Sequence, residues 1–235
     1  MLKKSILLIA FIAIAGSVSA QVRPGIKVGY NLVGVIAEDN YGRPSSESGY
    51  PDNFKMKSGF QGGLIADCPI NDFLAIQPGV RFAMLGFIDD HKPNQHHLRK
   101  FSLYYLQVPV YAQYRLNVAE ETNVVFQAGP YAGLGLFGRQ VFIQNGKSPD
   151  NFSDDLKKMN FGSEIQLFDY GIGVGAGIEF FRFQLMVSYD FGLNKVDFEK
   201  KGRGFVYDLG MHNQCLSVTF AVIFGRRDPL QNQRD

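Results

Sequence analysis

The chain has 235 residues, with 24 basic against 22 acidic side chains, and 46% of its residues are hydrophobic. A charge this close to balance gives no electrostatic case for binding nucleic acid, so we expect no nucleic-acid partner. Phe and Tyr are abundant, at 21 and 11 residues, and there are 26 Gly, a mixture that favours an all-β protein with aromatic girdles.

The first 20 residues have the pattern of a secretory signal peptide. Lys3 and Lys4 form a positive end, a short apolar core follows, and Val18-Ser19-Ala20 is a small-residue cleavage site. Cleavage there would leave Gln21 first, in a mature chain with 22 basic and 22 acidic residues. Beyond this segment no run of about 18 apolar residues occurs, so we predict no membrane-spanning helix.

The most regular stretch of the sequence is Ser102–Val118. From Tyr104 onward its even-numbered positions are apolar or tyrosine, whereas its odd-numbered positions carry Gln, Tyr and Arg. A period of two over this length indicates an extended strand with two different environments. The stretch exceeds the roughly 9–11 residues that a tilted strand needs to cross a bilayer. We therefore predict a membrane strand with its apolar face toward lipid and its polar face toward a barrel interior.

The same alternation predicts eight strands in all. They are a strand after Gln21 that includes Ile26 to Leu32, then Ser58–Cys68, Phe73–Phe87, Ser102–Val118, Val124–Phe137, Leu167–Phe180, Phe183–Phe191 and Gln214–Phe224. Long connections alternate with short turns. The long ones are Glu38–Lys57, Asp89–Lys100, Arg139–Gln166 and Gly192–Asn213, and the short ones are Pro69–Asp72, Asn117–Asn123 and Phe181–Arg182.

An even strand number with this alternation is typical of bacterial outer-membrane barrels. We predict an all-β fold, an eight-stranded antiparallel up-and-down transmembrane β-barrel at residues 21–225, with a signal peptide at 1–20 and a polar tail at 226–235. Both termini would be periplasmic and the long loops extracellular. The alternative, a soluble β-sandwich or lipocalin-like barrel, would expose an apolar band to water.

Three prolines lie inside predicted strands: Pro78, Pro109 and Pro130. Proline has no backbone N–H, and each strand of a closed barrel is paired on both sides. We therefore predict bulges or local breaks in the hydrogen-bond ladder at these positions.

Eight charged side chains fall on the inward faces of the predicted strands. They are Lys27, Arg81, Arg115 and Arg182 against Asp67, Asp169, Glu179 and Asp190. Eight strands enclose a lumen just wide enough for side chains, and buried charges must be paired. We predict a charge network that plugs the lumen, and the alternative is a polar path for a small solute. A row of inward glycines, Gly171 to Gly177, would leave space for larger side chains from opposite strands.

The sequence offers no recognisable catalytic set. His91, His96, His97 and His212 fall in or beside the long loops, where a zinc site or a hydrolase could use them, but no nucleophile–base–carboxylate spacing is present. We predict solvated loop histidines, no catalytic residue, no metal site and no cofactor. Cys68 and Cys215 lie near opposite ends of their strands, too far apart for a disulfide, so we predict two free thiols.

Three segments resemble strands of the PorT-like outer-membrane β-barrel family of Bacteroidota. Tyr105–Tyr114 resembles its Y-L-x-[IV]-P-[LV] strand, Gly25–Asn31 its opening G-x-K-x-G-x-N strand, and Ala75–Val80 its third strand, in which Gln77 stands where Glu is commoner. The resemblance covers nearly the whole mature chain. It implies an eight-stranded outer-membrane barrel of a Gram-negative bacterium, without catalytic residues. The family's namesake takes part in type IX (Por) protein secretion and gliding.

These inferences converge on a non-enzymatic outer-membrane barrel with a plugged lumen, whose long extracellular loops serve surface contact or envelope assembly. Its expected partners are outer-membrane lipid and other envelope or secretion proteins, and we expect a monomeric barrel. The alternatives are a component of type IX secretion, a small-solute pore, and a lipid-modifying enzyme at the barrel rim.

Overall fold

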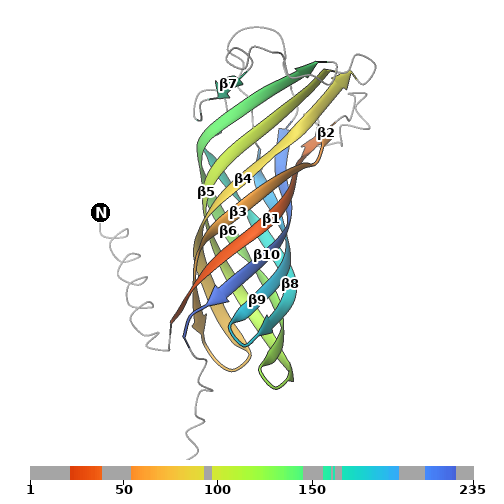
Figure 1. Cartoon of the computed structure of the whole chain (residues 1–235). Helices are drawn as coiled ribbons and strands as arrows, with labels where there is room; N and C mark the ends of the chain where they lie inside the picture. Colours follow the sequence, from red (N-terminus) through yellow and green to blue (C-terminus); the bar gives the residue numbers. More distant parts are fainter. Residues whose placement is uncertain are drawn as a thin grey trace, which may run out of the picture.

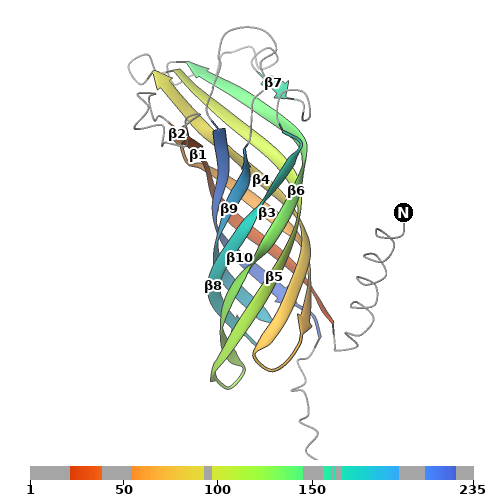
Figure 2. The same cartoon turned by 180° about the vertical axis from the view of Figure 1, so that it is seen from behind.

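The computed structural model describes residues 22–38, 54–92, 97–144, 156–159, 161, 166–195 and 210–225, which form one ten-stranded antiparallel sheet. The sheet is rolled into a barrel, with residues 22 and 225 at the same end as the short turns (Figures 1 and 2). The predicted signal peptide and the polar tail lie outside the described residues. The described part of the chain contains no helix that could cross a membrane.

Eight long strands make the barrel wall. They are β1 (Arg23–Glu38), β3 (Lys57–Pro69), β4 (Leu74–Lys92), β5 (His97–Ala119), β6 (Thr122–Gln144), β8 (Phe168–Phe180), β9 (Phe183–Lys195) and β10 (Gly210–Ile223). Two short strands extend this wall. Before β3, β2 (Phe54–Lys55) pairs with the far end of β4, and β7 (Leu156–Met159) pairs with the far end of β6 beyond the ladder that β6 forms with β8.

The barrel is closed by hydrogen bonds all the way around. The long strands pair in the order β4-β3-β1-β10-β9-β8-β6-β5, and β4 also pairs with β5. The first and last strands pair along most of their length, from Gly25 opposite Ile223 to Glu38 opposite Gly210. Each long strand therefore lies beside its neighbours in sequence, and the predicted eight-stranded up-and-down barrel is confirmed.

The outer face of the wall is apolar and the inner face is largely polar, the reverse of a water-soluble protein. Leu64 and Val174 on the outer face are 65% and 51% exposed, whereas Asn31 and Gln113 on the inner face are 0% exposed. An outer face that is apolar on every long strand is stable only where it contacts lipid. The predicted outward and inward faces of the wall strands are those of the structure, and the one exception among the predicted lumen charges, Arg182, is described below.

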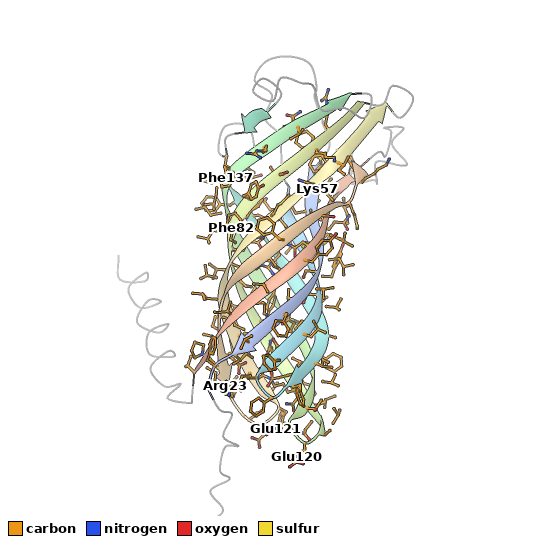
Figure 3. All side chains as sticks on the ribbon, in the orientation of Figure 1. Arg23, Lys57, Phe82, Glu120, Glu121 and Phe137 are labelled. Carbon is orange, nitrogen blue, oxygen red and sulfur yellow. The ribbon has the colours of Figure 1, made fainter. Side chains whose placement is uncertain are left out.

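Aromatic side chains form a row across the outer wall near the end with the long connections. The rings of Phe60, Phe82, Tyr104 and Phe137 follow one another at centroid distances of 6.1, 5.7 and 4.4 Å, and Figure 3 labels Phe82 and Phe137 there. Near the short turns, the ring of Phe73 packs on that of Tyr114.

The two aromatic levels are separated by the thickness of a membrane. Phe82 lies nine positions after Phe73 in the chain. A rise of about 3.3–3.4 Å per residue and a strand tilt of about 35–45° convert this into about 21–25 Å. That height matches the apolar band of about 25 Å between the girdles of outer-membrane barrels.

The prolines interrupt the ladder without shifting its register. Between β4 and β5 the pairing stops after Pro78 opposite Val110 and resumes at Arg81 opposite Gln107, with the same register on both sides. The ladder between β5 and β6 is interrupted in the same way after Pro109 opposite Tyr131. The ladder therefore has local breaks at the prolines, and the register shifts lie at other positions. At Pro130 the break affects only the pairing with β5, because the ladder with β8 continues through Pro130 opposite Ile172.

The strands extend further at the end with the long connections than the alternation predicts. β4, β5 and β6 project beyond the other strands there (Figures 1 and 2). Most of Asp89–Lys100, which we predicted to be a long loop, belongs to β4 and β5, and only residues 93–96 lie between them. The prediction was wrong because strands outside the membrane need no lipid-facing side chains, so their sequence lacks the alternation.

Both cysteines are free thiols, as predicted. Cys68 lies on β3 beside the short turn to β4 and is half-buried, whereas Cys215 on β10 is buried.

The depth of the outer wall in lipid can be measured with two matched substitutions. Val174→Arg at the middle of β8 should lower the free energy of unfolding in phospholipid vesicles by about 2–4 kcal/mol, because it places a charge near the bilayer midplane. Val118→Arg, at the end of β5 and 60% exposed, should cost only about 0–1 kcal/mol. Denaturant titration measures both values, and equal costs would contradict the transmembrane orientation.

Candidate functional site

Four charged side chains form a network inside the barrel near the short turns, which we call the basal network. Its members are Arg23, Asp67, Arg115 and Glu179, all buried. Arg115 donates to Asp67 at 2.5 Å through a terminal nitrogen and to Glu179 at 3.0 Å through Nε. Arg23 donates to Asp67 at 3.0 Å through Nε and lies 3.7 Å from Glu179. Two cations and two anions therefore neutralise one another.

Strand register brings the basal network together. Arg23 and Asp67 lie directly opposite each other on β1 and β3. Glu179 is the last inward residue of β8 before its turn, where Arg115 of β5 can reach it across the lumen. Figure 3 labels Arg23 near the lower end of the barrel, the end at which Glu120 and Glu121 are also labelled.

A layer of amides connects the basal network to the middle of the lumen. Gln113 accepts from Arg115 at 2.7 Å and from Gln184 at 3.4 Å. Its own amide donates to Gln127 at 3.3 Å, and Gln127 donates to Ser188 at 2.9 Å. All four side chains are buried, so this chain of hydrogen bonds fills the lumen above the ion pairs.

A second ion pair occupies the middle of the lumen, which we call the central pair. Arg81 of β4 donates to Asp190 of β9 at 2.5 Å and to Gln107 at 2.8 Å, and Tyr111 donates to Asp190 at 3.0 Å. The inward glycines of β8 make room for this arrangement. A Cβ atom at Gly173 would lie 2.3 Å from an Asp190 oxygen and 2.7 Å from the Tyr111 hydroxyl oxygen.

Two inward charges form no ion pair with any described residue. Lys27 donates to the side-chain oxygen of Gln77 at 2.8 Å. Asp169 is 1% exposed and has Asn213 and Tyr131 as polar neighbours. Among the seven described charges that were predicted for the lumen, one cation and one anion therefore lack an ion pair with a described residue.

The interior at the opposite end is apolar, and we call this part the apolar cap. Its buried residues are Val33, Val35, Leu85, Phe87, Phe101, Leu103, Tyr105, Met211 and Cys215, with Phe54 and Phe161 packed against them. The rings of Phe87 and Phe101 stack at 4.7 Å. Lys57 lies at the edge of this region and donates to Ser102.

Two small cavities lie between these layers, with volumes of about 20 Å³ and about 10 Å³. A cavity needs roughly 10–15 Å³ to hold a water molecule, so each has room for about one. Across the described residues the lumen is therefore a filled interior with a charged end, a polar middle and an apolar end.

Seven of the eight predicted lumen charges point into the barrel. These are Lys27, Asp67, Arg81, Arg115, Asp169, Glu179 and Asp190. The prediction for Arg182 was wrong. The ladder of β8 and β9 ends at Phe180 opposite Phe183, so Arg182 belongs to the turn, where it is exposed and lies 5.1 Å from the Phe181 ring centroid.

Sequence analysis missed Arg23, which takes the fourth cationic position. A signal for it exists, because Arg23 has the same parity as Gly25 and Lys27 and the alternation of β1 can be extended back to it. The count of four cations against four anions therefore holds with Arg23 in place of Arg182.

The histidines are not brought together in the described part of the chain. His212 lies on β10, half-buried, with its ring 6.2 Å from that of Phe191 and Nδ1 3.2 Å from the Gly192 carbonyl oxygen. The side chains of His91 and His97, and the whole of His96, lie outside the described residues. Within the described residues no group of three or more His, Cys, Asp or Glu side chains is placed to hold a metal ion.

A closed wall with a lipid-facing outer surface and a filled polar lumen defines an outer-membrane type of β-barrel protein. The chain belongs to the family described as outer membrane protein beta-barrel domain, which matches residues 15–197. It is therefore an outer-membrane β-barrel protein. No curated protein matches it in sequence.

Solved outer-membrane barrels are similar to it at low identity. The attachment invasion locus protein Ail of Yersinia pestis is 15% identical, with a TM-score of 0.41, over 87% of this chain and 100% of Ail. Neisserial surface protein A is 16% identical, with a TM-score of 0.39, over 85% of this chain and 97% of its own. OprG of Pseudomonas aeruginosa is 15% identical, with a TM-score of 0.36, over 86% and 96%.

The importance of the basal network can be measured by comparing two arginines. Arg115→Met should lower the free energy of unfolding by about 3–5 kcal/mol, because it leaves Asp67 and Glu179 buried with one cation between them. Arg182→Met, at the exposed turn, should change it by about 0.5 kcal/mol or less. Denaturant titration of the refolded barrel measures both, and equal effects would show that the interior charges do not depend on Arg115.

Proposed function

We propose that this outer-membrane barrel is non-enzymatic, that its lumen is a structural plug, and that its long connections mediate surface contact or envelope assembly. The filled lumen carries this proposal. Across the described residues the basal network, the central pair, the amide layer and the apolar cap fill the interior, and the two cavities between them measure about 20 Å³ and about 10 Å³. A barrel filled in this way keeps its variable polar surface outside the wall.

We infer that the end with the short turns faces the periplasm. Both described ends of the chain lie there (Figure 1), and outer-membrane barrels carry short turns on the periplasmic side and longer loops outside. The projecting parts of β4, β5 and β6 would then stand above the outer surface, at the end where the long connections leave the described strands. The surface available to a partner would be concentrated at this end.

The finer family assignment, to the PorT-like barrels of Bacteroidota, is part of the proposal. It is supported by three motifs that fall on wall strands: Gly25–Asn31 on β1, Ala75–Val80 on β4 and Tyr105–Tyr114 on β5. On this assignment a role in type IX secretion is the second candidate function. Loss of secreted cargo from a deletion strain would favour that role.

Location and closure can be tested with an outer-membrane fraction run on a gel with and without boiling. A closed barrel resists detergent until heated, so we expect two apparent sizes, with the protein recovered in the outer-membrane fraction. A single size, with the protein in the periplasm, would contradict the membrane barrel.

The plug can be tested by recording from the purified protein in a planar bilayer. We expect no steady conductance, because the lumen is filled from the basal network to the apolar cap. A steady, reproducible conductance would favour the small-solute pore instead.

The role of the long connections can be tested by shortening them. A variant with residues 145–155 and 196–209 replaced by short Gly-Ser linkers should still shift on boiling but fail to complement a deletion strain. The matched control replaces Glu120-Glu121 in a short turn by Asn-Gly and should complement fully. Full complementation by the shortened barrel would refute a function at that end.

A further inference from the structure

The larger cavity, of about 20 Å³, lies in the middle of the lumen beside Lys27. Its polar lining includes Gln61, Gln77, Ser217 and Thr219. These four side chains come from β3, β4 and β10, and Lys27 comes from β1, so separate parts of the wall line the cavity. The lining also reaches Leu64 and Val80, whose side chains are on the outer face.

Lys27 is the one interior lysine or arginine that lacks an ion pair among the described residues below the apolar cap. Arg23, Arg81 and Arg115 each lie within 3.0 Å of a carboxylate oxygen. The Lys27 ammonium has three hydrogens and one hydrogen-bond acceptor, the Gln77 oxygen at 2.8 Å. Burying a cation without a counter-charge is unfavourable. An anionic partner for Lys27 is therefore expected close to its ammonium group.

Two buried amide groups beside Lys27 also lack a partner. The Nε2 atoms of Gln77 and Gln61 have no hydrogen-bond acceptor in the structure, although these side chains are 1% and 5% exposed. The orientation of Gln77 is fixed by chemistry, because an ammonium group only donates and the amide oxygen must therefore face it. The unpartnered atom of the Gln77 amide is therefore the nitrogen, which is a donor, because exchanging the amide nitrogen and oxygen would place a donor against the ammonium.

Three acceptors around the cavity are occupied. The Gln127 oxygen accepts from Gln113, the Ser188 hydroxyl oxygen accepts from Gln127, and the Ser188 carbonyl oxygen accepts from Ser217. The cavity offers a guest the N–H groups of Lys27, Gln77 and Gln61, together with the Ser217 and Thr219 hydroxyls, which can turn to donate or to accept. A water molecule would bring two more hydrogens that need acceptors, whereas an anion accepts from every donor.

We propose that this cavity binds one small monovalent anion of the chloride class, held by the Lys27 ammonium and the side-chain amides of Gln77 and Gln61. One ammonium without a counter-ion calls for one negative charge. The volume suits a single small ion. The site does not depend on what the long connections contact.

The first test is refolding of the full barrel from denaturant at equal ionic strength in sodium chloride or sodium gluconate, whose anion is too large for the cavity. Refolding lets the ion enter before the lumen closes. The midpoint of thermal unfolding should be about 2–4 °C higher in chloride. This difference should vanish in Lys27→Met and persist in Lys57→Met, a lysine at the apolar cap that serves as the control.

Gln77→Glu keeps the test decisive if Lys27→Met fails to fold. It places a carboxylate where the Gln77 oxygen now lies 2.8 Å from the ammonium, and so supplies the missing charge within the chain. This variant should refold in gluconate with at least the wild-type midpoint in chloride, and its own midpoint should not depend on the anion. A chloride dependence that survives in Gln77→Glu would place the ion elsewhere and overturn the proposal.

Crystals grown in bromide give the direct readout. An anomalous peak within hydrogen-bond distance of Lys27 Nζ is expected in the wild type and should be absent in Gln77→Glu. Density in the wild-type cavity without an anomalous signal would show that water fills it, and would overturn the proposal.

Discussion

The lumen of an eight-stranded barrel is only as wide as the side chains of its own wall, and every inward residue must find its partners within that space. The outer wall faces lipid, so polar side chains are confined to the interior and meet one another there. The filled interior is a consequence of this geometry. Inward glycines, such as Gly173, leave space for the larger side chains of Tyr111 and Asp190. Small residues on one strand are therefore matched by large residues on the strands that face it.

Pairing within the lumen is uneven. The basal network satisfies two arginines with two carboxylates over short distances, from 2.5 to 3.7 Å. The central pair is supported by Gln107 and Tyr111. Lys27 and Asp169 remain outside both groups, although the formal charges of the interior sum to zero with Arg23 included. Neutrality of the whole lumen therefore does not ensure that each charge is compensated locally, because Coulomb attraction in a confined interior falls with distance.

The alternation of the sequence predicted the wall and most of the site, because a strand's period of two assigns each side chain to a face. The alternation assigned seven of the eight charges to the correct face. It failed at Arg182, because the β8–β9 ladder ends at Phe180 opposite Phe183 and a turn residue has no inward or outward face set by strand alternation. The extra length of β4 and β5 was missed for a related reason, since no lipid imposes alternation beyond the membrane. The partners of Lys27 could not be predicted, because which inward residues meet across the lumen depends on strand tilt and stagger.

The apolar cap raises the free energy of the interior charges that have no counter-charge. It closes the interior above the central pair with packed aliphatic and aromatic side chains, which keeps bulk water from the polar layers beneath. A lower local dielectric strengthens the ion pairs of Arg81 and Arg115 and, by the same physics, raises the free energy of an ammonium without a counter-ion. A barrel open to water at that end could leave Lys27 solvated. In this barrel the cap covers that end of the lumen, and the proposed anion would give the lysine a counter-charge and fill the cavity beside it.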